Sequence, residues 1–434
     1  MSTGRFTSGL LPLLIAAALP VTAVLATPAK ADEGAVKLLA TIPIPSSASA
    51  LHGFDISWVD QSTQTYYLAD RSNAAVDVVD AKNGTFTKLI KPTGTQAFAG
   101  VAFNANNTAN NDKSGPNGVV SSGRWLFVTD FNTRTLTGRA VAIDLTTGTI
   151  VSDVSTGGAA RADELAYDPQ GGTLLVVNNA DDPPFATLIS VNKATGALTV
   201  GARITLDAAN GVDATNGAEQ PVWDKGTGKF YLSIPQIGPN AENGAVARID
   251  PHSTGHVDAV FPVKFCQPAG LTLGPKQHLL LGCGQAFDTA GGTFSPADAN
   301  SAAPVSIVLD ATTGNVVATV KGVTGSDEVW FNRGDDRYYL AARNNPGGPA
   351  ASAVTPVLGV IDAQSNTLVQ VVPTINGAAN TASVATRFPA PSAHSVAADS
   401  HNNHVFVPLG ANNVFPDCLN GCIGVFGAPA GAED

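Results

Sequence analysis

Catalytic signature motifs are scarce in this sequence. It contains no Gly-x-Ser-x-Gly nucleophile turn, no His-Glu-x-x-His zinc motif and no glycine-rich phosphate loop between a strand and a helix. Charged residues make up only 14% of the chain, whereas 44 glycines and 28 prolines supply many turns. The missing motifs leave no sequence evidence for a nucleophilic hydrolase or a nucleotide-binding enzyme. The composition favours an all-β protein of many strands.

Positive charge is also in short supply. The chain has 24 Lys and Arg against 35 Asp and Glu, which gives a formal net charge of −11. An acidic surface argues against nucleic acid or an anionic membrane as a partner. Beyond the N-terminal segment, no apolar span is long enough to cross a bilayer. We expect a monomer whose partner is a small molecule or a protein.

The N-terminal segment reads as a signal peptide. Arg5 precedes an apolar stretch over residues 10–25, and the triplet Ala29-Lys30-Ala31 fits the small-x-small cleavage rule. The sequence therefore predicts a signal peptide over residues 1–31 and a secreted or periplasmic mature chain that begins at Asp32. A membrane anchor is the alternative, which two prolines within the apolar stretch and its shortness disfavour.

Cysteine is rare, and the sequence has no Cys-x-x-Cys motif. Cys266 and Cys283 flank adjacent predicted strands, and Cys418 and Cys422 would close a small loop before the last strand. In an oxidising compartment we expect the disulfides Cys266–Cys283 and Cys418–Cys422. A thiolate metal site is the alternative.

A four-stranded pattern organises the chain. Residues 161–204 contain four short apolar runs separated by turns rich in Asp, Pro and Gly, with no helical period. Equivalent units open at Asp55, Gly100, Glu164, Gln220, Gly270, Glu328 and Ser395. The third run of six units ends in Asp or Asn at a turn, as in Asp144-Leu-Thr-Thr-Gly148.

Repeats of four strands at intervals of roughly 45 to 67 residues predict a β-propeller, here with seven blades. The last unit has only three strands of its own, and residues 36–42 would supply its outer strand and close the ring. We expect one propeller domain over residues 32–427 and a frayed tail over residues 428–434. A β-sandwich or β-helix is the alternative.

The loops divide between two faces. Long second-to-third-strand loops in units five, six and seven would overhang the face on which the first strands begin, which we call the funnel face. An Asn-rich insertion over residues 104–122 is expected between the first and second strands of unit two, on the opposite face. A column of aromatic residues is expected to pack between blades: Trp58, Phe103, Tyr167, Trp223 and Phe331.

Polar residues gather where the predicted first strands begin. We expect these at the funnel face: His52, Asp55, Asp163, Glu164, Glu219, Gln220, Gln267, Asp327, Glu328 and His394. Secondary candidates stand at the ends of the second strands: Asp70, Arg71, Asp130, Asn179, Arg343 and Asn344.

Three interpretations of this polar set stay open. Such groups can simply line a wet channel and bond the backbone of the next blade. Carboxylate oxygens can instead hold a divalent cation, Ca²⁺ first, with Mn, Fe or Zn if a histidine joins them. A catalytic site is the third possibility, with no catalytic residue identified. Arg71, Arg161 and Arg343 would relieve repulsion among crowded carboxylates.

The repeat resembles the seven-bladed YVTN-type propellers of exported bacterial proteins. The resemblance rests on residues 126–130 and 175–179, and on Asp-x-x-Thr-Gly turns followed by runs such as residues 316–320. It covers nearly the whole mature chain and implies the fold, but no particular function. A second resemblance is to calcium-dependent lactonases of the SMP-30 and gluconolactonase kind. It implies that Glu164, Glu219 or Glu328 would hold the metal.

Two functions follow as hypotheses. The first is an exported propeller that binds a small ligand, an ion or a protein at its funnel face without catalysis. The second is a metal-dependent hydrolase of the lactonase type, with the metal in the central channel.

Overall fold

The computed structural model describes residues 1, 34–288, 290–294, 304–346, 356–374, 393–415 and 417–429. Residues 2–31 of the predicted signal peptide and residues 430–434 of the predicted tail lie outside the described residues. Within the described ranges, no helix is long and apolar enough to cross a membrane.

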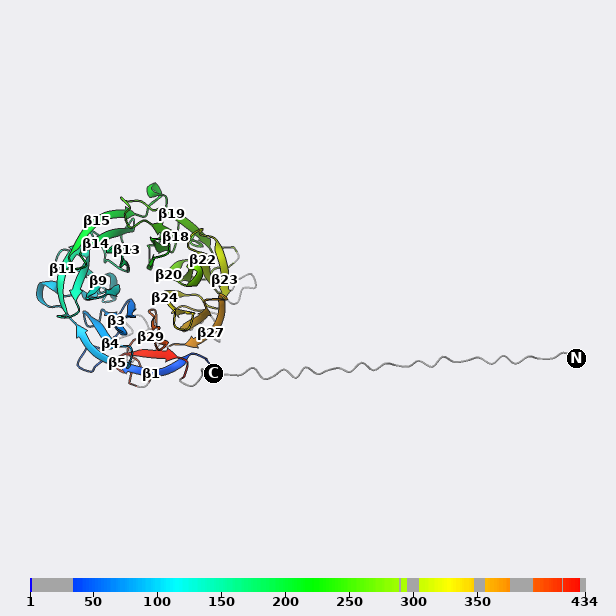
Figure 1. The fold of residues 1–434 in the computed structure, drawn as a ribbon, viewed down its shortest axis with the longest axis horizontal. Coiled ribbons are helices and arrows are strands. Elements are labelled where there is room, and N and C mark those ends of the chain that lie inside the picture. Colours follow the sequence, from blue (N-terminus) through cyan, green and yellow to red (C-terminus); the bar gives the residue numbers. More distant parts are fainter. Residues whose placement is uncertain are drawn as a thin grey trace.

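Seven four-stranded antiparallel sheets form the blades of a β-propeller around a central channel, as Figure 1 shows in the view along the channel. Blades one to three are β2 (Ser57–Asp60), β3 (Thr65–Asp70), β4 (Ala75–Asp80), β5 (Thr85–Ile90); β8 (Val119–Ser122), β9 (Trp125–Asn132), β10 (Thr137–Asp144), β11 (Thr149–Ser155); and β12 (Leu165–Asp168), β13 (Thr173–Asn178), β14 (Phe185–Val191), β15 (Leu198–Thr205).

Blades four to six repeat this order, each from the innermost strand outward. They are β16 (Pro221–Asp224), β17 (Lys229–Ile234), β18 (Asn243–Ile249), β19 (Ala259–Lys264); β20 (Pro268–Leu273), β21 (His278–Cys283), β22 (Val305–Asp310), β23 (Val316–Lys321); and β24 (Ser326–Asn332), β25 (Arg337–Ala342), β26 (Val357–Asp362), β27 (Thr367–Pro373). Three short 3₁₀ turns also occur in the described residues, η1 (Gly94–Gln96), η2 (Ala208–Asn210) and η3 (Pro275–Gln277).

The last blade contains both ends of the propeller. It combines β28 (Ala397–Asp399), β29 (His404–Leu409) and β30 (Cys422–Gly427) with the N-terminal β1 (Lys37–Pro43). β1 pairs antiparallel with β30, and Figure 1 shows blue β1 beside the red C-terminal strands. The predicted seven blades and the predicted closure by an N-terminal strand are therefore confirmed, and β30 has no open edge.

Five of the seven inner strands end at an Asp or Asn side chain that caps the following turn. Asp168, for example, accepts hydrogen bonds from the backbone N–H groups of Gln170 and Gly171, both at 2.9 Å. The turn brings the chain back into a second strand such as β13, which is buried along its whole length. The outermost strands are less buried: in β27, exposed residues alternate with half-buried or buried ones. Local turn chemistry and this gradient of burial generate each blade.

The hydrophobic core is divided among the interfaces between neighbouring blades. Apolar side chains of the described residues form seven buried clusters, and each cluster joins two adjacent blades. Phe127 of blade two and Leu174 of blade three belong to one such cluster. Because no blade buries its faces alone, the ring is the unit of stability.

Both predicted disulfides are present. Cys266 bonds to Cys283 and Cys418 bonds to Cys422, with Cα atoms 4.9 Å apart in each pair. The first joins the start of blade five to the end of β21, and the second closes the loop before β30.

Blade two differs from the prediction. Residues 100–103 were expected to form its inner strand, but β8 (Val119–Ser122) pairs with β9 and takes that place. β6 (Gly100–Phe103) instead pairs with β7 (Ala109–Gly115) in a separate two-stranded hairpin. The sequence misled because both segments are short apolar runs, and only pairing with β9 distinguishes them. Phe103 therefore lies outside the blades, and it is 38% exposed.

Blade one is shifted by one residue from the prediction. Ser57 pairs with Leu68, just as Leu165 of blade three pairs with Val176. The residue equivalent to Glu164 is therefore Ile56, not Asp55. Matching acid with acid and aromatic with aromatic places Asp55 at Glu164 and Trp58 at Tyr167, but the turn capped by Asp60, equivalent to the turn capped by Asp168, fixes the register one residue away.

Candidate functional site

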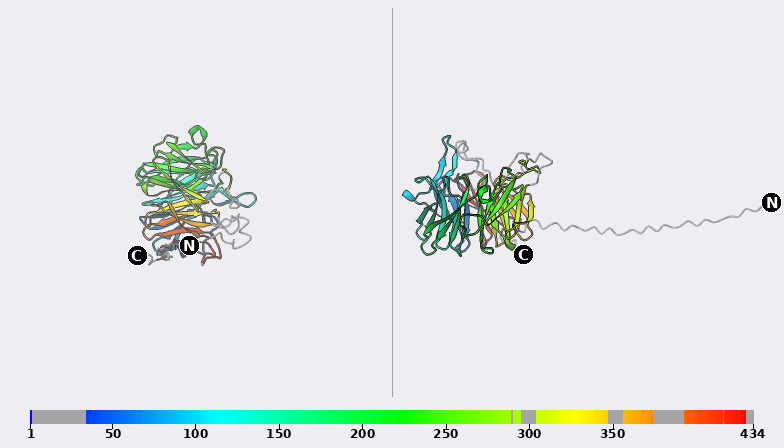
Figure 2. Two further views of the ribbon diagram at one scale, coloured as in Figure 1. Left: turned by 90° about the vertical axis from the view of Figure 1, so that its right-hand side faces the viewer. Right: turned by 90° about the horizontal axis from the view of Figure 1, so that it is seen from above.

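The two ends of the central channel have different chemistry. All seven inner strands begin on the funnel face, and the turns that follow them lie on the opposite face, which we call the turn face. The predicted acids that precede the inner strands, such as Asp55, Asp163 and Asp327, therefore lie at the funnel face. The β6–β7 hairpin was expected on the turn face but lies on the funnel face, where Figure 2 shows it projecting from the ring.

Asp55 and Arg71 form a buried ion pair at the funnel end of the channel. The side chains are 13% and 6% exposed. The Nε2 atom of His394 lies 3.6 Å from the second carboxylate oxygen of Asp55. Arg71 also donates to Asn117 at 2.9 Å. Burial alone would raise the pKa of Asp55, but Arg71, His394 and Arg161 together hold it below its usual range.

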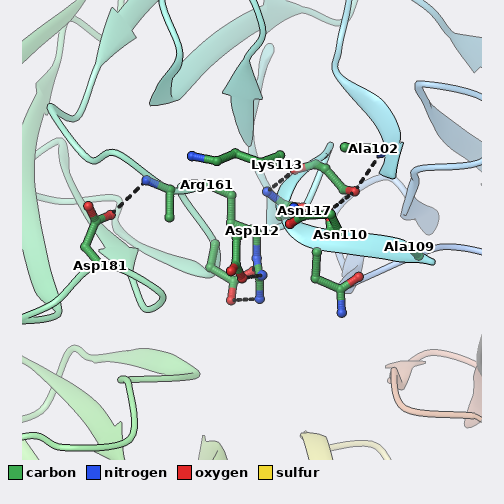
Figure 3. A network of polar contacts seen from close by, with 12 residues as sticks. Ala102, Ala109, Asn110, Asp112, Lys113, Asn117, Arg161 and Asp181 are labelled. Atoms are coloured by element: carbon green, nitrogen blue, oxygen red, sulfur yellow. Dashed lines mark hydrogen bonds and ion pairs between the residues drawn. The ribbon is translucent and has the colours of Figure 1, made fainter. Parts of the chain in front are cut away.

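Arg161 forms a second ion pair that anchors the hairpin. Its Nε and Nη2 atoms donate to the two oxygens of Asp163 at 2.8 and 2.7 Å, and Nη1 lies 3.4 Å from Asp112 of β7. Figure 3 shows Arg161 and Asp112 within the network of polar contacts around this segment. Asn117 also donates to the backbone of Ala162 at 2.7 Å. The hairpin is thus fixed to blade three.

A third pair joins Arg343 to Asp327, with Nη1 and Oδ2 atoms 2.9 Å apart. Glu219 belongs to the same electrostatic neighbourhood. Burial, and then the charges of Asp163 and Asp327, raise the pKa of Glu219 to about 8 against the opposing effect of Arg161 and Arg343.

The funnel acids are thus matched mainly with arginines. Across the described ranges, no group of three or more His, Cys, Asp or Glu side chains is arranged to hold a metal ion. The arginine pairing fits the expected relief of repulsion between crowded carboxylates.

Several predicted site residues lie away from the channel. Asp130 is paired with Arg139 at 2.6 Å inside blade two, and Asp70 accepts hydrogen bonds from Asn73 inside blade one. Gln267 donates to the backbone of Ala241 at 3.1 Å. The remaining three occupy funnel-face loops: His52, Asn179 and Asn344. Asp70 ends β3 and Asp130 lies within β9, so the packing of these second strands buries both side chains within their blades.

A cavity of about 480 Å³ occupies the channel below the funnel ions. It reaches exposed Ser62, Gly123 and Pro169, which belong to turns that follow inner strands, so it opens at the turn face. Its inner end is lined by Glu164, Gln220 and Glu328, three predicted site residues that the fold brings together. Its other lining residues are Ile56–Gln61, Val119–Ser122, Leu165–Tyr167, Pro221–Trp223 and Trp330.

The cavity wall is aromatic. Three of the four tryptophans in the chain, Trp58, Trp223 and Trp330, line it together with Tyr167. The rings of Trp58 and Trp330 meet edge to face with centroids 5.1 Å apart. The expectation that the column of Trp58, Tyr167 and Trp223 serves packing between blades is thus incomplete, because these residues also bound an open space. Trp330 was missed, although it stands two residues after Glu328.

Two of the inner-end residues tie blades together. Gln220 accepts hydrogen bonds from the backbone N–H groups of Leu271 and Val329, at 2.8 and 3.2 Å, in the next two blades. Glu328 accepts from Val396 at 2.9 Å and from Ser57 at 3.3 Å, again in the next two blades. Burial raises the pKa of Glu328 to about 8, although these hydrogen bonds oppose the rise.

Comparisons with known proteins identify the fold alone. No protein family matches the chain, and no curated protein matches it either. Among solved structures, it is similar to a chain of hydrazine synthase from Kuenenia stuttgartiensis, with a TM-score of 0.57 and 12% identity over 85% of this chain and 95% of that one. It is also similar to a chain of a mitotic checkpoint complex, with a TM-score of 0.55 and 13% identity over 98% and 99% of the two chains.

Proposed function

We propose that this protein is an exported β-propeller that binds a small organic molecule in its central channel without chemical conversion. The observation that carries the proposal is the 480 Å³ cavity, with aromatic side walls and polar groups converging at its inner end. This size and this combination of apolar wall and few polar groups are typical of small-molecule sites. The proposal moves the ligand from the funnel face, where arginines already neutralise the acids, to the channel.

Export is the second part of the proposal. Two disulfides join all four cysteines, and such bonds persist in oxidising compartments. They support the predicted signal peptide and a secreted or periplasmic location. The metal-dependent lactonase and the resemblance to YVTN-type propellers stay predictions, because no observation in the described residues favours either.

The native tryptophans provide the test. Trp125 is the only tryptophan away from the cavity, and its Nε1 atom donates to the backbone of Lys193 at 2.8 Å. In a Trp125→Phe chain, all three remaining tryptophans line the cavity, so selectively excited tryptophan fluorescence would report on it. We expect compounds from a chemically mixed panel to change this fluorescence and to bind in calorimetry.

Blocking the channel is the control. Ser122 lines the cavity near the turn face, and Ser122→Trp would fill that end, whereas Ser122→Ala would leave it open. Binding that survives Ser122→Trp, or the absence of any binder, contradicts the proposal. Arg343→Ala at the funnel end is expected to leave binding unchanged.

A further inference from the structure

The position of Glu164 is one at which neighbouring blades exchange hydrogen bonds. Gln220 and Glu328 occupy the same position in blades four and six, directly before the residue that pairs with the second strand. In the next two blades, the residue that immediately follows this position donates its backbone N–H to the side chain. Gln220 accepts in this way from Leu271 and Val329, and Glu328 from Val396 and Ser57. A side-chain oxygen here therefore normally has two built-in amide donors.

Glu164 lacks both donors. In the next blade the donor position is Pro221, which has no N–H. In the blade after that, the donor is Leu271, whose N–H is already bonded to Gln220. Accordingly, within the described part of the chain the Glu164 side chain makes no hydrogen bond and no ion pair, although it is only 5% exposed. A buried carboxyl without a partner is costly, and this one lines the cavity.

The rest of the cavity wall is acidic and aromatic. Three carboxyl side chains line it, Asp60, Glu164 and Glu328, and no described Lys, Arg or His does. The Asp60 carboxylate accepts hydrogen bonds from the hydroxyl groups of Ser62 and Ser121, at 2.6 and 2.7 Å. The Glu328 carboxyl accepts hydrogen bonds from the backbone N–H groups of Val396 and Ser57. Glu164 is thus the acid left available to a ligand.

These features select the charge of the ligand. An anion would meet three acids and no positive side chain. A cation would gain a carboxylate partner and the negative faces of aromatic rings, which attract ammonium groups within roughly 6 Å of a ring centre. Burial, and then the charge of Glu219 and other nearby acids, raise the pKa of Glu164 well above its usual value, so the carboxyl of the empty site holds its proton, and a bound ammonium group would favour the ionised carboxylate.

We propose that the channel ligand is an organic ammonium ion, held by the Glu164 carboxylate and the aromatic wall. The inference rests on the proposed binding function and adds the chemical class of the ligand. It also assigns Pro221 the role of keeping Glu164 free.

The test compares charged probes with neutral probes of the same shape. Choline and 3,3-dimethylbutan-1-ol form one pair, and benzylammonium and benzyl alcohol form another. Calorimetry and fluorescence with the Trp125→Phe chain are expected to show that the ammonium member of each pair binds more tightly. Glu164→Gln is expected to weaken the binding of the ammonium probes by roughly 30-fold or more.

A second variant tests the role of Pro221. Pro221→Ala restores an N–H at the donor position, which would satisfy Glu164 internally and weaken ammonium binding several-fold while Glu164 itself is retained. Glu242→Gln, outside the cavity lining, is the same exchange of side chains and is expected to have no effect. Circular dichroism verifies that each variant is folded.

The outcomes separate the two proposals. If the neutral probes bind as tightly as the ammonium probes and Ser122→Trp abolishes both, the channel site stands and the ammonium inference is wrong. The inference is also overturned if neither ammonium probe binds at millimolar concentration, or if both Glu164→Gln and Pro221→Ala leave their affinity unchanged. Ammonium binding that persists in Ser122→Trp contradicts the channel site itself.

Discussion

The hydroxyl of Ser395 in blade seven donates a 2.6 Å hydrogen bond to the buried carboxyl of Glu328 in blade six. The same oxygen accepts from the amides of Val396 and Ser57, so one side chain joins three blades across the ring closure. Blade one and blade seven are joined at the rim by β1 and at the channel by Glu328.

We expect Glu328→Ala to lower the free energy of unfolding by about 2 kcal/mol, because it leaves buried donors without an acceptor. Glu328→Gln is the matched control and should retain most of the stability, since Gln220 does the same task with an amide oxygen. Urea unfolding of the three chains measures the difference. Equal losses for the two variants would show that the bonds to the neighbouring blades are not what stabilises this position.

The ion pair of Arg71 and Asp55 leads to a second prediction. Arg71→Met would leave the buried Asp55 carboxylate without its main partner, at a cost of about 3–5 kcal/mol. Adding Asp55→Asn should recover part of the loss, which a double-mutant cycle would quantify. Arg343→Met removes the more exposed partner of Asp327 and should cost about 1 kcal/mol or less. A similar cost for the two arginine variants would contradict the difference in burial.

The raised pKa values predict how stability depends on pH. Glutamates of the unfolded chain release their protons near pH 4.5, whereas the pKa of Glu219 and of Glu328 in the folded chain is about 8. Between these values the folded chain binds more protons than the unfolded chain, so the contribution of each group to stability is present below pH 4.5 and is lost as the pH rises through 8. The slope is at most about 1.4 kcal/mol per pH unit for each group.

Denaturant unfolding at pH 5, 7 and 9 would measure this loss. The comparison chain is the double variant Glu219→Gln/Glu328→Gln, in which the two groups no longer titrate. We expect the stability difference between the parent and the double variant to shift against the parent as the pH rises. A pH-independent difference would show that these glutamates keep ordinary pKa values.

The two disulfides should contribute unequally. The Cys266–Cys283 bond spans 17 residues and the Cys418–Cys422 bond spans 4. Loop-closure entropy then predicts a loss of about 3 kcal/mol for Cys266→Ala/Cys283→Ala and about 2 kcal/mol for Cys418→Ala/Cys422→Ala. Thermal unfolding of both variants, with the oxidised parent chain as reference, gives the comparison. A larger loss from the short loop would contradict the ranking.

The repeating elements of this protein could be predicted from the sequence because they are local. A buried second strand recurs in each blade, and an Asp or Asn that begins a turn, such as Asp144 or Asp310, recurs in six of the seven. The count of blades and the closure by β1 follow from that repetition, and the two disulfides follow from the placement of the cysteines beside predicted strands. The inner strand of blade two was not predictable, since residues 100–103 and 119–122 look alike until one of them pairs with β9.

The chain alone therefore determined the blades, their number and the acids at their inner ends. Only the tertiary structure decided which of those acids are neutralised by Arg71, Arg161 and Arg343, and which one is left without a partner. The arginine pairs are local, 2 to 16 residues apart along the chain, and depend on how each loop folds over the channel. The hydrogen-bond partners of an inner-end side chain such as Gln220 come instead from the next two blades, about 50 to 110 residues away. In the sequence, Pro221 is an ordinary strand residue. Its missing N–H leaves Glu164 without a donor only because blades three and four lie side by side in the fold.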